Sequence, residues 1–280
     1  MRLPKPVNYY LDRKTRAKPP AGHMFTSVHY SDIHFPYHDP HALDILYQIL
    51  AVAKPDLVVD HGDTMDCEAI SRFEKDPAAR VSLQEEVRLT AEHHAQVQAL
   101  TPEAAHLWLL GNHEDRFRRL LWKLAEKRDV GELLGLEALT NSWDLAVLTG
   151  VDKWDWEVMP YPRHKLLFDR LVLTHGSTVR KWSAYSAKAE YERYRKSGMS
   201  GHTHRRGVHE HRDYDTTNAW WELGCLCSIR ADYTVHPDWA QGFAVVTWSK
   251  DRTEFGVEEV RINEGVTFFR GQRYESRVKV

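Results

Sequence analysis

The chain has 280 residues, a mass of 32.6 kDa, and 38 basic against 40 acidic residues. This length suits one large α/β domain with a substantial core better than two small domains, and the near balance of charge excludes a global electrostatic attraction to nucleic acid or to an anionic membrane. The three cysteines show no CxxC spacing, and the sequence has neither an apolar run of about 18 residues nor an apolar N-terminal signal core, so we expect a soluble, cytoplasmic protein without membrane contact.

Residues 1–22 contain four prolines and scattered basic residues, which predicts an extended N-terminal arm in front of a single domain over 23–280. A poorly ordered terminus is the alternative. The first half of the domain alternates strand and helix patterns, and Asp39 and Pro40 are typical of a helix start. The predicted elements are strands at 25–31, 56–60 and 106–110 and helices at 40–53, 81–100 and 114–127.

The second half begins with a looser pattern at about 130–160, where Trp143, Trp154 and Trp156 stand among acidic residues and glycines. We interpret this segment as an insertion or cap that borders a functional site. Two strands at 165–169 and 171–175, a helix at 183–196 and then a series of short strands follow. Alternating β and α patterns first, and mostly β patterns later, predict an α/β fold: two packed mixed β-sheets flanked by helices, a four-layer αββα sandwich.

Side chains that bind metals follow plausible strands at five places. Asp32 and His34 follow the first strand, and because side chains alternate along a strand, we expect both to emerge on the same side. Each motif alone is common, but the four later ones each place a carboxylate, amide or imidazole beside a glycine, and all five together predict a dinuclear metal site over five loops. The other four motifs are HGDTMD at 61–66, GNHE at 111–114, THG at 174–176 and GHTH at 201–204.

This ordered set closely resembles the calcineurin-like metallophosphoesterase family, whose members carry D-x-H, GD-x-x-D, GNH[DE], xxH and GH-x-H motifs on loops at the ends of central strands. The resemblance spans residues 32–204. It implies that His113 is the catalytic acid and that Asp66 orients it. It further implies one metal bound by Asp32, His34, Asp63 and His204, with Asp63 bridging to a second metal that Asn112, His175 and His202 complete.

The donor set is chemically consistent with this assignment. Mixed imidazole and oxygen ligands suit divalent transition metals better than Ca or Mg, and we expect Mn first, with Fe, Zn or Ni as alternatives. Two such ions opposite the carboxylates of Asp32 and Asp63 leave a positive centre that attracts phosphate. They also lower the pKa of a bridging water toward about 7, which makes hydroxide available to attack phosphorus in line with the leaving oxygen.

The substrate is expected to be a phosphate ester, and one departure from the family pattern bears on its class. In members that act on phosphoserine and phosphothreonine, an arginine follows GD-x-x-D, whereas here Cys67 follows. A diester carries one charge and needs such a clamp less than a monoester does, which favours a phosphodiester, with nucleic acid or a nucleotide derivative kept open. Arg116 and Arg205 are candidate substrate-binding residues that would restore a monoesterase, and a non-catalytic metal-bound scaffold is a further alternative. The oligomeric state is left open.

Several other residues have both a functional and a structural interpretation. His29, His38 and His61 lie near the motifs and are interpreted mainly as structural. The basic run from Arg116 to Lys123 suits a solvated helix face better than a contact with a nucleic-acid backbone. The tryptophans of the insertion suit core packing or stacking on bases. Cys225 and Cys227 suit small buried residues better than metal ligands.

Overall fold

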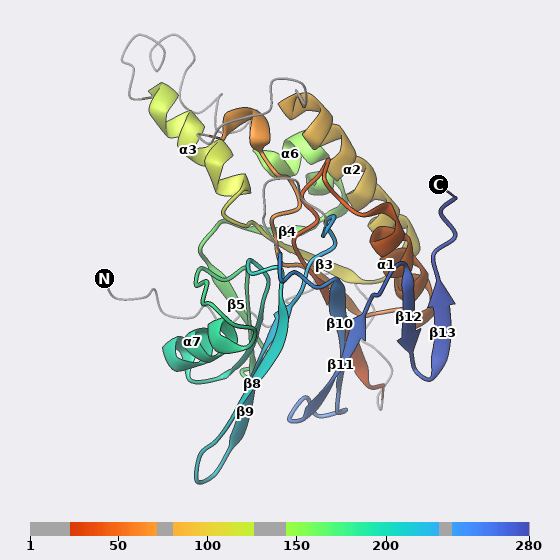
Figure 1. Ribbon diagram of the computed structural model, residues 1–280, viewed down its shortest axis with the longest axis vertical. Helices are drawn as coiled ribbons and strands as arrows, with labels where there is room; N and C mark the ends of the chain where they lie inside the picture. The colour runs from red at the N-terminus through yellow and green to blue at the C-terminus, as the bar shows by residue number, and fades with distance from the viewer. Residues whose placement is uncertain (1–22, 72–80, 126–143, 230–236, 280) are drawn as a thin grey trace.

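The computed structural model describes residues 23–71, 81–125, 144–229 and 237–279, and two β-sheets form its frame (Figure 1). The predicted arm at 1–22 and the first part of the predicted insertion, 130–143, lie outside the described residues. No helix within the described ranges combines the length and the apolarity that a bilayer crossing requires.

The first sheet has six strands in the order β11-β10-β1-β2-β3-β4. The strands β1 to β4 run parallel, whereas β10 and β11 pair antiparallel at one side. Every residue of β1 and β2 is buried, because both faces of the sheet are covered. The strands are β1 (Phe25–Tyr30), β2 (Leu57–Asp60), β3 (Ala105–Leu109), β4 (Glu157–Met159), β10 (Gly242–Trp248) and β11 (Phe255–Arg261).

The second sheet has five strands in the order β5-β6-β7-β9-β8, and a separate hairpin of β12 (Val266–Phe269) and β13 (Gln272–Glu275) follows β11. The strands β6, β7 and β9 run parallel, and antiparallel strands flank them on both sides. The strands are β5 (His164–Leu167), β6 (Leu171–Thr174), β7 (Ser197–Ser200), β8 (Arg206–Arg212) and β9 (Thr217–Leu223).

Three apolar clusters between these elements establish four layers. The helices α1 and α2 cover one face of the first sheet, where Ile45 and Val97 pack against Val58. The other face packs against the second sheet, and α7 covers the outer face of that sheet, on the opposite side of the molecule from α1 and α2 (Figure 1). The predicted αββα sandwich is confirmed. The helices are α1 (Pro40–Ala53), α2 (Leu83–Leu100), α3 (Glu114–Ala125), α6 (Leu145–Thr149) and α7 (Tyr185–Tyr194), with short 3-10 turns at Glu68–Ile70 and Val151–Trp154.

The first helix begins and ends as its sequence predicts. The carboxylate of Asp39 accepts hydrogen bonds from the backbone N–H groups of His41 and Ala42, and Pro40 occupies the first turn. At the other end, Lys54 adopts a left-handed conformation and its N–H donates to the Leu50 carbonyl. The buried face of α1, made of leucines, isoleucines and alanines, packs on the first sheet and so holds the loop that follows β1.

The described part of the predicted insertion joins the first sheet. The strand β4 pairs with β3, and Trp156 stacks on His106 at 4.6 Å while its indole N–H donates to Gln98. Trp156 is therefore a core residue, the structural one of the two interpretations. Whether the remainder forms a cap stays a prediction, because residues 130–143 lie outside the described part of the chain.

The strand β7 has a sequence, SGMS, that resembles no strand pattern, yet it lies between β6 and β9 in the second sheet. Gly198 is required there, because a Cβ atom at this position would lie 2.3 Å from the Trp220 ring. This strand matters for the site, because it carries the GHTH motif at its end.

Candidate metal centre

The seven predicted metal ligands converge from both sheets. Asp32 and His34 follow β1, Asp63 follows β2 and Asn112 follows β3, so they leave the same edge of a parallel arrangement. His175 directly follows β6, and His202 and His204 follow β7. Gly201 makes this meeting of two sheets possible, because a Cβ atom there would lie 1.8 Å from the Ser31 hydroxyl oxygen.

Six of the seven residues form two compact groups. Asp32, His34 and His204 place one donor atom each within 4.8 Å of one another, and so do Asp63, His175 and His202. In the first group, the Nε2 atoms of His34 and His204 are 2.9 Å apart. Each group combines a carboxylate with two imidazoles, a donor set that fits a divalent transition metal.

Asp63 lies between the two groups, and Asn112 joins the second. The Oδ2 atom of Asp63 is 3.2 Å from Nε2 of His175 and 3.9 Å from Nε2 of His34. The amide oxygen of Asn112 is 3.1 Å from Nε2 of His175. Asp63 thus contacts both groups, and Asn112 contacts the second one.

The reason why Asp32 and His34 face the same centre differs from the expected one. β1 ends at Tyr30, so strand alternation does not orient them. Both adopt left-handed backbone conformations, with φ of 57° and 55°. Asp63, His202 and His204 share this conformation, which is strained for residues other than glycine. Hydrogen bonds hold it: the Asp32 N–H donates to the Gly62 carbonyl, the His34 N–H to the Asp63 carbonyl, and the His202 N–H to the Asp32 carboxylate.

His113 and Asp66 lie beside these ligands. Nδ1 of His113 donates to the main-chain oxygen of Asp66 at 2.7 Å and lies 3.1 Å from its Oδ1 atom, while Nδ1 of His34 is 2.8 Å from the same Oδ1. One carboxylate therefore orients two imidazoles and leaves both Nε2 atoms directed at the centre. Burial alone would raise the pKa of Asp66, but the hydrogen bonds from His113 and His34 outweigh it and hold that pKa below its usual range.

Comparison with known proteins gives the decisive observation. A family model described as calcineurin-like phosphoesterase matches residues 25–206, which include both ligand groups. The chain belongs to the calcineurin-like phosphoesterase family. Membership supports a metal-dependent phosphoester hydrolase in general, and the family typically uses two metal ions.

Several solved structures resemble the chain at low identity. Vacuolar Protein Sorting 29 from Cryptosporidium parvum is 12% identical, with a TM-score of 0.47, and the match covers 90% of this chain and 99% of that one. Chaetomium thermophilum Vps29 is 10% identical, with a TM-score of 0.40 and coverage of 91% and 97%. GAP50 of Plasmodium is 11% identical, with a TM-score of 0.37 and coverage of 92% and 90%. No curated protein sequence matches the chain significantly.

The electrostatics of the ligand groups fit cations at the family's metal positions. Burial alone would lower the pKa of His175, but the charge and hydrogen bond of Asp63 outweigh it and raise that pKa to about 9. Asp63 itself has a pKa well below its usual range, because His175 and His113 outweigh the effect of burial. Asp32 likewise has a pKa below its usual range, because His204 and His34 outweigh the effect of burial. Both buried carboxylates therefore require positive neighbours, which a pair of divalent ions would supply.

The two predicted substrate-binding arginines behave differently. The guanidinium of Arg116 donates to the main-chain oxygen of Asp66 at 2.9 Å and lies 3.0 Å from Nε2 of His113, so it borders the centre. The guanidinium of Arg205 pairs with Asp238 at 2.7 Å and donates to the Arg180 carbonyl. Cys67, at the position of the arginine in phosphoprotein phosphatases, is fully buried.

Glu114, the last residue of GNHE, has a role that the motif did not reveal. Its carboxylate accepts four backbone N–H groups at 2.7–3.0 Å, three from the loop after β2 and one from Gly111. It therefore fixes the loops of Asp63 and Asn112 relative to each other. Burial, together with the charge of Asp63, raises the pKa of Glu114 to about 7. Asp60, the last residue of β2, also holds the loop that follows this strand, because its carboxylate accepts hydrogen bonds from the Gly62 N–H and the Thr64 hydroxyl.

Histidines 29 and 61 form a buried hydrogen-bonded chain between the sheets. Nδ1 of His61 donates to the Thr174 carbonyl at 2.9 Å, so its Nε2 accepts from Nδ1 of His29 at 3.1 Å, and the Ser27 hydroxyl donates to the remaining nitrogen of His29. In return, Nδ1 of His175 donates to the His61 carbonyl at 2.8 Å. These bonds support the structural interpretation of His61 and His29. Their position also indicates that they hold the ring of His175, a predicted metal ligand.

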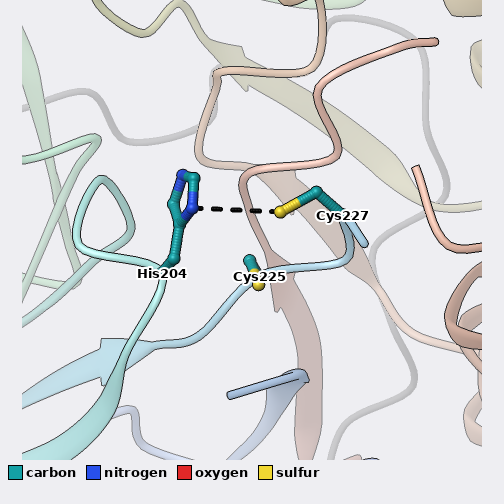
Figure 2. A group of neighbouring side chains, drawn as sticks. All are labelled: His204, Cys225 and Cys227. Atoms are coloured by element: carbon teal, nitrogen blue, oxygen red, sulfur yellow. Dashed lines mark hydrogen bonds between the residues drawn. The ribbon is translucent and has the colours of Figure 1, made fainter. Parts of the chain in front are cut away.

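The segment that carries Cys225 and Cys227 also contacts the centre (Figure 2). The backbone N–H groups of Leu226 and Cys227 both donate to the Asp32 carbonyl at 3.0 Å. The thiol of Cys227 lies 3.9 Å from Nδ1 of His204, a weak contact. A hydrogen bond with Cys225 and burial raise the pKa of Cys227, so the thiol stays protonated, which suits a packing residue rather than a metal ligand.

Proposed function

We propose that this chain is a dinuclear-metal phosphodiesterase, with Mn as the first choice of metal. The observation that carries the proposal is the arrangement of two ligand groups with Asp63 between them. Asp32, His34, Asp63 and His204 would hold one ion, and Asp63, Asn112, His175 and His202 the other. When bound, the two ions would activate a bridging water and neutralise charge on the phosphoryl oxygens.

The residues around the ions supply the rest of the chemistry. With Nδ1 of His113 engaged by Asp66, its Nε2 is directed at the centre. In the imidazolium form, Nε2 would give its proton to a leaving oxygen that takes the place next to it which the Arg116 guanidinium now occupies. Asp66 is a positioning residue in this proposal. Arg116, next to Nε2 of His113, would keep the leaving group or a phosphoryl oxygen in place.

The preference for a diester follows from the position after GD-x-x-D. Cys67 is fully buried there and burial raises the pKa of its thiol, so its side chain offers no charge to the substrate. A diester with one negative charge needs one cationic partner besides the metals, and Arg116 is suitably placed to be that partner.

A monoesterase is the second candidate, and Arg116 is again the observation that favours it. Its guanidinium lies beside His113 and has N–H groups beyond the two that contact Asp66 and His113, and a dianionic phosphate would engage these. Arg205 is less suited to this role than its sequence position indicated, because Asp238 and the Arg180 carbonyl already engage it.

Hydrolysis of a chromogenic bis-ester and of the matching monoester by Mn-loaded protein separates these candidates. We expect faster turnover of the bis-ester. The reverse preference would assign a phosphomonoesterase, and hydrolysis of neither ester, with metal bound, would assign a scaffold. The control is Asp63→Ala, which we expect to lose activity toward both esters together with its metal.

A further inference from the structure

The loop at 177–185, which follows directly from His175 and Gly176, has an unusual surface. Three of its apolar side chains are exposed: Val179 and Trp182 at 57% and Tyr185 at 59%. Arg180 and Lys181 stand among them, and the segment from Gly176 to Ala189 contains no acidic residue. An exposed group of aromatic and basic side chains beside a metal ligand has no packing explanation within the described residues.

Hydrogen bonds hold the backbone of this loop in place, so its exposed side chains have a fixed position on the surface. Arg205 donates to the Arg180 carbonyl, and the Ser183 hydroxyl donates to the Arg206 carbonyl, which ties the loop to the residues after GHTH. The Ala184 N–H donates to Glu222 at 2.6 Å and the Arg180 N–H to Ser186 at 2.9 Å. Arg205 therefore serves the loop, and through it the loop adjoins His202 and His204.

From these observations, we propose that the loop 177–185 binds single-stranded nucleic acid and leads it to the metal centre, an inference that rests on the proposed phosphodiesterase function. Exposed aromatic rings stack on unpaired bases, and basic side chains contact the phosphates between them. Lys181 lies 4.8 Å above the ring of Trp182, so one position offers both contacts. A duplex hides the faces of its bases and gains less from the rings.

The basic helix α3 offers a direct comparison within the same chain. Trp122 is 59% exposed, with the guanidinium of Arg118 4.9 Å above its ring, much like Trp182 and Lys181. However, Arg118 and Arg119 both pair with Asp115, whereas no carboxylate among the described residues pairs with Arg180 or Lys181. The cation over the exposed ring is thus paired with a carboxylate on α3 but not on the loop, which is why the proposal assigns the strand to the loop and not to α3.

Fluorescence anisotropy with a labelled oligothymidylate, and with protein whose metal has been removed by a chelator, tests the proposal without depending on turnover. We expect Trp182→Ala to weaken binding about tenfold. Lys181→Glu is expected to weaken it and to lower the slope of log affinity against log salt by about one to two. The matched control Trp122→Ala is expected to bind like the parent, and the duplex form of the probe to bind more weakly than the single strand.

The outcomes separate this proposal from the proposed function. Unchanged binding by Trp182→Ala, an equal loss in Trp122→Ala, or equal affinity for the duplex overturns the loop assignment, even if the Mn-loaded parent hydrolyses the small bis-ester. Failure of the parent to hydrolyse that bis-ester, with loop-dependent binding intact, instead overturns the phosphodiesterase and leaves a nucleic-acid-binding surface.

Discussion

The two sheets hold their metal ligands by different means. In the first sheet, the loops after β2 and β3 are fixed by the carboxylate of Glu114, which accepts four backbone N–H groups. In the second sheet, carbonyl groups orient the ring of His175 on the side away from Asp63: its Nδ1 donates to the His61 carbonyl, and the His61 ring donates to the Thr174 carbonyl. The ligands of the second sheet also depend on the first sheet for their position, because the His202 N–H donates to the Asp32 carboxylate. We call the ligands of the first and the second sheet the first and the second half of the centre.

This difference predicts an order of sensitivity. Hydrogen bonds to a carboxylate are stronger than neutral ones, and removing one partner of a buried set leaves several donors unsatisfied. Substitutions of the buried carboxylates in the first half should therefore affect folding and metal binding together. Substitutions that loosen His175 should affect mainly its metal, with the fold preserved.

The largest effect is expected from the two residues at the centre of the first half. We expect His113→Ala to lower kcat by about a thousandfold while both metals stay bound, because a general acid contributes about 10²–10⁴. We expect Asp63→Ala to lose metal as well as activity, because its carboxylate lies between both ligand groups. Metal analysis of the two purified variants checks this division, and equal metal content in both would contradict it.

Glu114→Gln tests whether the first half depends on one carboxylate. The amide nitrogen of glutamine would face two of the four N–H donors, so two buried groups lose their acceptor. We expect a loss of about 2–4 kcal/mol in the free energy of unfolding, measured by denaturant titration. Glu210→Gln on β8, at an exposed position, is the control and should change stability by less than about 0.5 kcal/mol. A Glu114 variant as stable as this control would remove the proposed difference between the halves.

The proton content of the metal-free centre offers a test of both halves. Because the pKa of His175 is raised to about 9 and that of His34 is also raised, each imidazole carries a proton at neutral pH that a metal must displace. Affinity for Mn should therefore rise with pH, at least tenfold per unit between about pH 6 and 8, and level off near pH 9. Calorimetry in two buffers of different ionisation enthalpy counts the released protons. Release of one proton would indicate that a metal displaces a proton in one half of the centre, and release of two would indicate displacement in both. A Kd independent of pH would contradict the assignment of His34 and His175 as metal ligands.

The sequence could indicate which side chains converge because their chemistry is local to short motifs. Strand ends and donor types were visible at Asp32, Asp63, His175 and His204, and the capping of α1 by Asp39 was equally local. The reason for the convergence of Asp32 and His34 was not visible, because a left-handed backbone at both residues is stabilised by carbonyls of the neighbouring loop rather than by their own neighbours in sequence.

Features that depend on distant partners could not be predicted. β7 is a strand because Gly198 accommodates the ring of Trp220, a residue 22 positions away in sequence and buried by the fold. Arg205 was assigned to the substrate from its place after GHTH, but its partners are Asp238 and Arg180. Likewise, GNHE identifies Glu114 without indicating that it accepts four N–H groups from two loops.

His61 provides the smallest expected effect and the closest test of the second half. His61→Phe removes the donor to the Thr174 carbonyl and the acceptor for His29, whereas His61→Asn retains an N–H group at the position of Nδ1. Because partners that orient a metal ligand contribute about tenfold or more to affinity, we expect the Phe variant to bind the weaker of two Mn equivalents about tenfold less tightly. The Asn variant should recover most of that affinity, because its side-chain N–H can still donate to the Thr174 carbonyl at the end of β6. Recovery would separate orientation from packing, because asparagine fills the buried space less well than phenylalanine, and a purely structural role would rank the two variants in the opposite order.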